Sequence, residues 1–291
     1  MILVVGATGY LGGLISRRLL GNGKPVRIVA RPASDYSELA SLGAMPIKAD
    51  LKDAASLKLA CKGAKVVIST ANSARRAGAD NIESVDLRGN RNLIEAAVEA
   101  GVEHFIFITA YGASLSHPAP FLQAKARTEE VLRASGLSYT ILSPHIFMDA
   151  WIPRVVGSAL RENRPVLLVG KGERRHSFIA AADVADFAIA AVEHETAKNR
   201  SIPLGGPAAV SWRDIIRLVE SRVGQTIQVH SVPAGQPLPQ LADMIAGLLT
   251  TMEMADIEIP MCETAQTFGV GLTNVEQFIN RAFSKPTLPN D

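Results

Sequence analysis

The sequence contains very little cysteine and no excess of either charge. Cys61 and Cys262 are the two cysteines in 291 residues, too few for a disulfide framework or a cysteine-based metal site. The 30 Lys and Arg residues nearly balance the 28 Asp and Glu residues, which argues against a surface built to bind nucleic acid or membranes. The six histidines are scattered along the chain. We therefore expect no metal site and no nucleic-acid partner.

Long apolar segments are also lacking. The chain starts directly with strand-like residues, without the basic region and apolar core of an export signal. The most apolar late segment, residues 238–254, is interrupted by Asp243 and Glu253 and is too short and too polar to cross a bilayer. These features predict a cytoplasmic protein that does not enter a membrane. At 47% hydrophobic residues, the chain has enough core for one large domain or one domain and a small cap.

The start of the chain has the pattern of a strand, a glycine-rich turn and a helix. Residues 2–5 are apolar, glycines follow at positions 6, 9 and 12, and apolar residues at helical spacing begin at Leu11. Such a turn offers backbone N–H groups and a positive helix end to a pyrophosphate. We expect Gly6 to turn the chain, Gly9 to let the backbone approach phosphate, and Gly12 to let the helix pack on the strand. The glycine spacing alone is weak, but its context favours dinucleotide binding over a purely structural turn.

Strand and helix patterns alternate through the first half of the chain. Because the strands are apolar along their whole length, they predict a parallel sheet with helices on both faces. The predicted fold is therefore α/β, a Rossmann-type doubly wound sheet over residues 1–145. Strands are expected at residues 26–30, 45–48, 64–70, 104–109 and 138–142, and the longest helices at 82–100 and 121–134.

The alternation loosens after Pro144. We interpret residues 146–291 as a smaller substrate-side lobe, some elements of which return to the main sheet. Helices are expected at residues 146–161, 183–193, 211–223, 238–251 and 275–281, and short strands at 166–169, 177–178, 201–204 and 227–232.

The end of the second strand predicts the choice of cofactor. An NAD site places an acid about 20 residues beyond the glycines, whereas NADP needs a cation for its 2′-phosphate. Here Arg31 follows the strand, Ser34 is a possible helper, and the first acid is Asp35. A guanidinium suits phosphate, so Arg31 favours NADP, with NADPH preferred over NADH. The alternative is a solvated surface arginine.

The run Gly6-Ala7-Thr8-Gly9-Tyr10-Leu11-Gly12 resembles the first turn of atypical short-chain dehydrogenases. In particular it is similar to the NmrA-like group, which includes isoflavone-reductase-like and quinone-reductase-like proteins. The resemblance covers most of the chain and implies that these turn residues bind the cofactor. It implies further cofactor contacts from residues after later strands and in the following helices: Asp50, Leu51, Asn90, Lys125 and Pro144. Thr70 and Ala71 are further candidates because the small side chains at the end of their strand leave room for the cofactor. Asp53, close to Asp50, could instead be just the N-cap of the helix that follows. Ser69, Thr70 and Ala71 equally fit a plain transition from strand to loop.

The resemblance also implies a catalytic lysine without its usual partner. Active short-chain dehydrogenases commonly carry Tyr-x-x-x-Lys on the helix after the fifth strand, with both side chains on one face. This chain has Phe121 and Lys125 at those places, so the usual proton donor is missing while the cofactor clamp remains. The alternative for Lys125 is an exposed helix lysine beside Glu129.

Other candidates lie near the expected nicotinamide. Tyr111 and His145 are candidates for proton transfer, and Thr109 takes the place of the hydroxyl residue that orients the substrate. For the substrate we assign the apolar residues Phe147, Met148 and Trp151, and His176 at the rim. The alternatives are a core stripe for the apolar residues and a structural role for each histidine.

The sequence thus predicts an NADPH-dependent oxidoreductase. Its small-molecule substrate is expected to be a flat conjugated acceptor, such as a quinone or an enone, because the negative charge that develops on such an acceptor is delocalised without a tyrosine acid. The rival is a non-catalytic NADP(H) sensor that binds a partner protein, as the resemblance to NmrA permits. A monomer and a homodimer are both left open.

Overall fold

The computed structural model describes residues 1–73, 78–234, 236 and 243–284. The chain forms two compact units, which are described separately. The first, here called the sheet unit, comprises Met1–Pro144, Val184–Pro203 and Phe268–Val270. The second, the C-terminal unit, comprises His145–Asp183, Leu204–Thr267 and Gly271–Asp291.

The sheet unit is built on seven strands in the order β10-β6-β5-β4-β1-β2-β3. Neighbouring strands from β3 to β6 pair in parallel. The order 3-2-1-4-5-6 within it is that of the Rossmann fold, so the predicted α/β class is confirmed. The strands are β1 (Ile2–Val5), β2 (Val26–Ala30), β3 (Met45–Lys48), β4 (Val66–Ser69), β5 (His104–Ile108), β6 (Tyr139–Pro144) and β10 (Arg200–Leu204).

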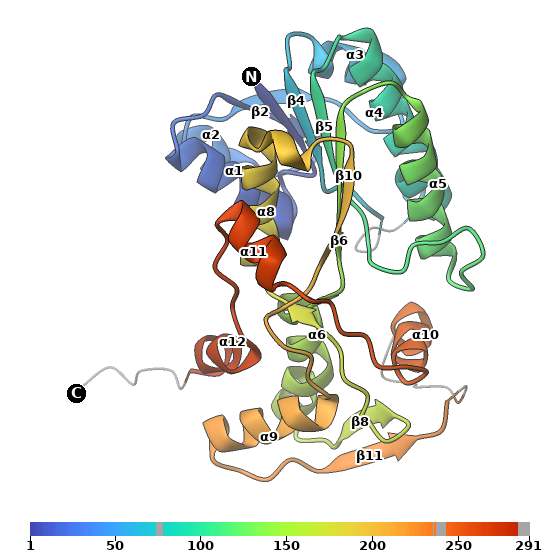
Figure 1. Cartoon of the computed structure of the whole chain (residues 1–291), viewed down its shortest axis with the longest axis vertical. Coiled ribbons are helices and arrows are strands. Elements are labelled where there is room, and N and C mark those ends of the chain that lie inside the picture. The colour runs from blue at the N-terminus through green and yellow to red at the C-terminus, as the bar shows by residue number, and fades with distance from the viewer. Residues whose placement is uncertain (74–77, 235, 237–242, 285–291) are drawn as a thin grey trace. The chain divides into compact units, whose positions relative to one another are not determined.

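Helices cover both faces of this sheet. Figure 1 shows α1 and α2 on one side and α3, α4 and α5 on the other. The second group buries apolar side chains against the strands, among them Leu57, Leu93 and Leu132 over Val67 and Phe105. The helical elements are α1 (Tyr10–Gly21), α2 (Ser37–Ser41), α3 (Ala54–Cys61), η1 (Ile82–Leu87), α4 (Arg88–Glu99), α5 (Pro120–Ala134), α8 (Ala181–Glu193) and η3 (Glu195–Ala197).

Two of these helical elements start where the sequence predicted a helix start: α3 follows Asp53, and η1 begins at Ile82. Asp53 accepts hydrogen bonds from the N–H groups of Ala55 and Ser56, so it is the N-cap of α3. The single helix expected at 82–100 instead starts with the π-helical element η1. The amide of Asn90 donates to the carbonyls of Val85 and Asp86 at 3.2 and 3.1 Å, which satisfies acceptors at this wide turn.

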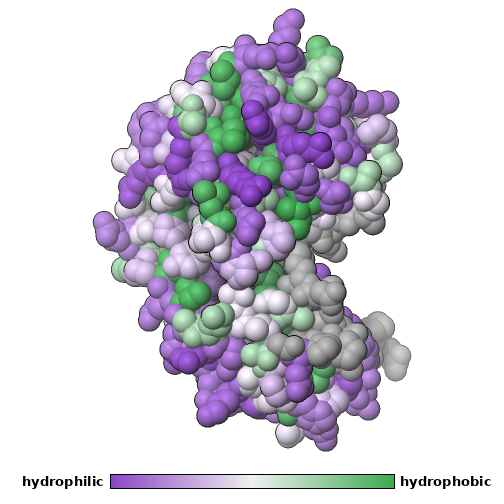
Figure 2. Space-filling model, turned by 90° about the vertical axis from the view of Figure 1, so that its right-hand side faces the viewer, coloured by the Kyte–Doolittle hydropathy of each residue, from purple (hydrophilic) through white to green (hydrophobic). Residues whose placement is uncertain are grey.

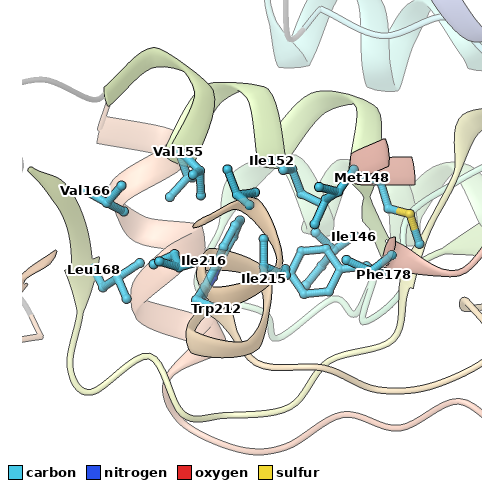
Figure 3. Close-up of a cluster of buried hydrophobic side chains, with 14 of the residues drawn as sticks. Ile146, Met148, Ile152, Val155, Val166, Leu168, Phe178, Trp212, Ile215 and Ile216 are labelled. Carbon is cyan, nitrogen blue, oxygen red and sulfur yellow. The ribbon is translucent and has the colours of Figure 1, made fainter. Parts of the chain in front are cut away.

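The C-terminal unit has its own core, drawn in Figure 3. Apolar side chains from β7, α6, β8, β9 and α9 interlock there, with the rings of Phe178 and Trp212 edge to face at 5.2 Å. The elements are β7 (Ile146–Phe147), α6 (Met148–Ile152), η2 (Pro153–Gly157), α7 (Ser158–Arg161), β8 (Val166–Val169), β9 (Phe178–Ile179), α9 (Trp212–Val223), β11 (Val229–Val232), α10 (Asp243–Met252), α11 (Cys262–Phe268) and α12 (Val275–Ala282).

Three details of this unit differ from the sequence expectation. The helix expected at 146–161 starts with the two residues of β7 and widens into a π-turn at Pro153, which has no N–H to donate. The helix expected from 238 is described from Asp243 on, and residues 238–242 lie outside the described part. Helix α11 was missed, because its polar sequence has weak apolar periodicity.

Candidate functional site

The glycine turn between β1 and α1 forms one wall of the site. Gly6 has a φ of +89°, a conformation that residues with a Cβ rarely adopt. Its carbonyl accepts the N–H of Gly9 at 2.9 Å, and a Cβ on Gly12 would lie 2.2 Å from that same oxygen. Gly12 therefore allows α1 to approach the turn itself, rather than the body of the strand.

The first turn of α1 is open to an anion. Among the described residues it has no side-chain cap hydrogen bond and no acidic side chain, and a helix end of this kind binds a phosphate through its N–H groups and dipole. Thr8, Gly9 and Tyr10 are exposed at this end, and Leu11 is half-buried. This cradle fits the pyrophosphate of a dinucleotide.

Thr70 and Ala71 line the turn from the next strand. The Thr70 N–H donates to the carbonyl of Val5 at 3.0 Å, and a Cβ on Gly6 would lie 2.5 Å from the Thr70 hydroxyl. Strand order reverses between β1 and β4, and ligands of open α/β sheets bind in the crevice at such a point. Both residues thus lie beside the glycine turn, and their contact with the cofactor stays a prediction.

Arg31 leaves the end of β2 and is half-exposed, but it is not a simple solvated arginine. Its Nη1 lies 3.0 Å from Oδ2 of Asp80, and Nζ of Lys52 lies 2.5 Å from Oδ1 of the same carboxylate. Ser34 donates its N–H to the Arg31 carbonyl at 2.9 Å. Sequence reasoning missed Lys52 and Asp80, because only the folded chain brings residues 31, 52 and 80 together.

Asp50 and Leu51 follow β3 and fix the local backbone. Oδ1 of Asp50 accepts the N–H of Lys52 at 2.8 Å, and the buried Leu51 packs against Gly89, where a Cβ would come within 2.8 Å. Asn90 is fully buried, and its Oδ1 accepts the hydroxyl of Ser69 at 2.9 Å. Its amide donates to η1, so Asn90 fixes the local backbone, and its expected contact with the cofactor stays a prediction.

Lys125 is buried at 2% exposure, so the alternative of an exposed surface lysine is wrong. Its Nζ lies 3.6 Å from Oδ1 of Asp86 and over the rings of Phe107 and Phe121, at 5.0 and 5.4 Å from their centroids. Burial lowers the pKa of Lys125, while the charges of Asp86 and then Glu129 oppose that shift.

Asp86 is held in place by hydrogen bonds from Ser73 to the carboxylate oxygen that does not face Lys125. Its Oδ2 accepts the N–H of Ser73 at 3.0 Å and the Ser73 hydroxyl at 2.5 Å. Its buried Oδ1 accepts no hydrogen bond among the described residues, and the Lys125 ammonium faces it. The pair therefore forms a buried charged group beside the carboxyl ends of β4 and β5. The sequence pointed to Lys125 but not to its partner Asp86.

Thr109 and Tyr111 follow β5. The buried Thr109 donates its hydroxyl hydrogen to Oε1 of Glu129 at 2.7 Å, while Oε2 of Glu129 binds Arg133 at 2.9 Å. In this structure the hydroxyl hydrogen of Thr109 is donated to Glu129, and its expected role in orienting the substrate stays a prediction. Tyr111 is half-buried and its N–H donates to the Pro144 carbonyl at 3.0 Å.

The C-terminal unit pairs the two histidines of interest. Nε2 of His176 donates to the Met252 carbonyl at 2.8 Å, which leaves Nδ1 to accept from Nε2 of His145 at 3.3 Å. Burial, reinforced by His176, lowers the pKa of His145 to about 3. His145 is therefore a neutral imidazole near pH 7 and is unsuited to act as an imidazolium acid.

The three apolar substrate candidates divide between core and partial exposure. Met148 is fully buried in the core of Figure 3, which is the alternative that the sequence left open. Phe147 and Trp151 are half-buried, and Trp151 packs against the same core. Their role in binding a substrate stays a prediction.

The surface of the sheet unit also has a groove formed by two of its helices. A groove of about 540 Å³ between α4 and α5 is lined by Ile94, Val98 and Val131 together with charged side chains. On the face drawn in Figure 2, hydrophobic side chains form small groups among hydrophilic ones.

Within the described ranges, no helix combines the length and the apolar character needed to cross a bilayer. In the same residues, no group of three His, Cys, Asp or Glu side chains could hold a metal ion.

A family profile described as NAD(P)H-binding matches residues 6–195, more than half of the chain. The chain belongs to this NAD(P)H-binding family. The match includes the glycine turn, Arg31 and Lys125, and it confirms both the NAD(P)H cofactor and the resemblance to NmrA-like atypical short-chain dehydrogenases.

The proteins that this chain is similar to carry different names. The photosystem II assembly factor Ycf39 of Cyanophora paradoxa is 33% identical over 232 residues, which cover 80% of this chain and 71% of that protein. Phenylcoumaran benzylic ether reductase PT1 of Pinus taeda is 28% identical, covering 83% of this chain and 81% of its own. The NADPH complex of an Escherichia coli NADPH-dependent quinone oxidoreductase has a TM-score of 0.82 at 21% identity, covering 98% and 100%, a likeness of fold.

Proposed function

We propose that this protein is an NADPH-dependent reductase of a small conjugated acceptor, such as a quinone or an enone. The observation that carries the proposal is the buried pair of Lys125 on α5 and Asp86 on η1, in the same sheet unit as the glycine turn. Burying a charge pair costs desolvation free energy, so a lysine without a function would be more stable at the surface. Relatives named as quinone and benzylic ether reductases support the same class of reaction.

The residues of the chain divide the work as follows. The cofactor, when bound, supplies the hydride. The open end of α1 binds its pyrophosphate, and Arg31 binds its 2′-phosphate. Lys125, held by Asp86, orients the nicotinamide end through the ribose hydroxyls.

The missing tyrosine favours conjugated acceptors over simple ketones. Phe121 occupies its place and offers no proton, and neutral His145 is a poor acid. A conjugated acceptor receives hydride at carbon, and its ring or double bonds delocalise the negative charge that develops. The reaction then depends less on a strong proton donor in the protein.

The proposal is tested by a turnover screen. Purified protein with NADPH should lose nicotinamide absorbance on addition of quinones or enones, and substitution of half-buried Trp151 by Ala should reduce that rate if it lines the substrate pocket. Circular dichroism must show that the variant still folds. No turnover over a wide acceptor panel would reject the reductase.

A second candidate function is a non-catalytic NADP(H)-dependent partner-binding protein. Two observations favour it: the tyrosine is replaced by Phe121, and the photosystem II assembly factor is the 33% identical relative. This function predicts no acceptor-dependent oxidation of NADPH. It also predicts a partner protein whose measured affinity changes between NADP⁺ and NADPH.

A further inference from the structure

The carboxylate of Asp80 bridges two cations that stand at the ends of adjacent strands. β2 and β3 pair in parallel with Ala30 opposite Lys48, so the segments that follow them leave the sheet at the same edge. Arg31 Nη1 lies 3.0 Å from Oδ2 of Asp80, and Lys52 Nζ lies 2.5 Å from Oδ1. Within the described part of the chain, Oδ2 thus faces Arg31 and Oδ1 faces Lys52.

The carboxylate of Asp80 is much less exposed to solvent than the two cations that it pairs with. Asp80 is 10% exposed, whereas Arg31 and Lys52 are 41% and 37% exposed. The carboxylate lies between the cations, and both cations still reach solvent. A dissolved anion can therefore approach them without any opening of the core.

We propose that this carboxylate occupies the place of the NADPH 2′-phosphate, and that Lys52 is the second cation of that phosphate site. The inference rests on the proposed use of NADPH. A guanidinium binds phosphate oxygens with two parallel hydrogen bonds, and an ammonium binds as a point charge. A phosphate monoester carries about −1.5 to −2 charges near pH 7, more than one carboxylate, so it matches two cations better.

Exchange of one anion for the other is feasible because partly exposed ion pairs are weak in water. Asp80 then lowers the affinity for NADPH by competing with it, while NADH, which has no 2′-phosphate, is unaffected. Asp80 thereby sets how strongly the site discriminates between the two cofactors.

The test compares ligands with and without the 2′-phosphate. NADPH, NADH, adenosine 2′,5′-bisphosphate and AMP are titrated against the parent, Asp80→Asn, Lys52→Met and the double variant. The two adenosine fragments contain no nicotinamide, so their binding reports on the phosphate site whether or not the protein is a reductase. Glu103→Gln is the matched control, because it removes the same charge from an exposed pair with Lys65 before β4 and β5, at the other end of the strands.

The expected outcome is specific to the phosphate. Asp80→Asn should bind NADPH and the bisphosphate roughly threefold or more tighter, and Lys52→Met should bind them several-fold more weakly, with NADH and AMP unchanged. The double variant should lose most of the gain, and high salt should shrink all differences.

Three results would overturn the inference. One is an Asp80→Asn affinity for NADPH that is equal to or below that of the parent. Another is an equal gain for NADH, or for NADPH in the Glu103→Gln control. The third is a parent that binds neither NADPH nor the bisphosphate, which would also end the proposed use of NADPH; absence of turnover with intact selective binding would reject the reductase alone.

Discussion

At the scale of single residues, Lys125 has the surroundings that matter most for the proposed reaction. Its ammonium is buried beside Asp86 and between two phenylalanine rings. Such a group is held in one position, and small errors in placing a hydride donor are expensive in rate.

We expect Lys125→Ala to weaken NADPH binding by about 1.5–3 kcal/mol, the scale of a hydrogen bond to a charged group. It should also lower kcat, because the nicotinamide is misplaced. Fluorescence titration and steady-state kinetics measure the two effects. Arg127→Ala, at an exposed position of the same helix, is the control and should behave like the parent. Parent-like values for Lys125→Ala would remove this residue from the site.

Phe121→Tyr tests the missing proton donor. The phenylalanine ring lies next to Lys125, so a hydroxyl on it would be near an ammonium, and a nearby positive charge lowers the pKa of a tyrosine. We expect ketone reduction to rise while NADPH affinity hardly changes. The ratio of ketone to quinone turnover gives the answer, and an unchanged ratio would show that proton donation does not limit the reaction.

At the scale of an element, α1 depends on one close approach. A Cβ on Gly12 would lie 2.2 Å from the Gly6 carbonyl, whereas a Cβ on Gly21, at the other end of α1, meets nothing within 4 Å. Gly12→Ala should therefore cost about 1–3 kcal/mol of unfolding free energy and displace the phosphate-binding N–H groups. Gly21→Ala should be neutral or slightly stabilising. Denaturant unfolding and NADPH titration compare them; equal behaviour would contradict the packing role of Gly12.

The pairing of β5 with β6 makes stability depend on pH through His104. Thr140 donates its hydroxyl to the Ala197 carbonyl, so it accepts from Nε2 of His104 at 2.8 Å, and the buried Nδ1 has no partner among the described residues. Burial, followed by the charge of Lys198, lowers the pKa of His104 to about 4.

Since an unfolded histidine has a pKa of about 6.5, the unfolded chain binds the extra proton first as pH falls. The contribution of neutral His104 is complete above pH ~6.5 and is lost by pH ~4, for about 3 kcal/mol in total. Urea unfolding across this range should show a smaller loss for His104→Gln than for the parent. Parallel curves would mean that other groups, such as His145, carry the dependence.

At the scale of the whole molecule, cofactor binding should raise stability. A ligand that binds only the folded state adds about 2.7 kcal/mol at a hundredfold excess over its Kd. We expect NADPH to raise Tm more than NADH at the same concentration, because NADH lacks the 2′-phosphate that we propose Arg31 and Lys52 to bind. Differential scanning fluorimetry measures both shifts. Equal shifts for the two cofactors would contradict the choice of NADPH.

The local elements and the class of the fold follow from the order of residues along the chain. Apolar strands of four or five residues, the helical spacing after Leu11 and the left-handed glycine at position 6 are short-range properties. They depend on backbone sterics and on the burial of one face of each element, and both are determined by residues close together in the sequence. For the same reason the glycine turn and the position of Arg31 at a strand end could be read directly from the chain.

Only the tertiary structure decided what surrounds those residues. Asp86 reaches Lys125 from the wide turn of η1, Asp80 bridges Arg31 and Lys52, and His176 meets His145 across 31 positions. These contacts join segments that are far apart in the sequence, and their partners have no fixed spacing. Burial and charge pairing, which set the pKa of Lys125 and the state of His145, exist only once the chain has folded.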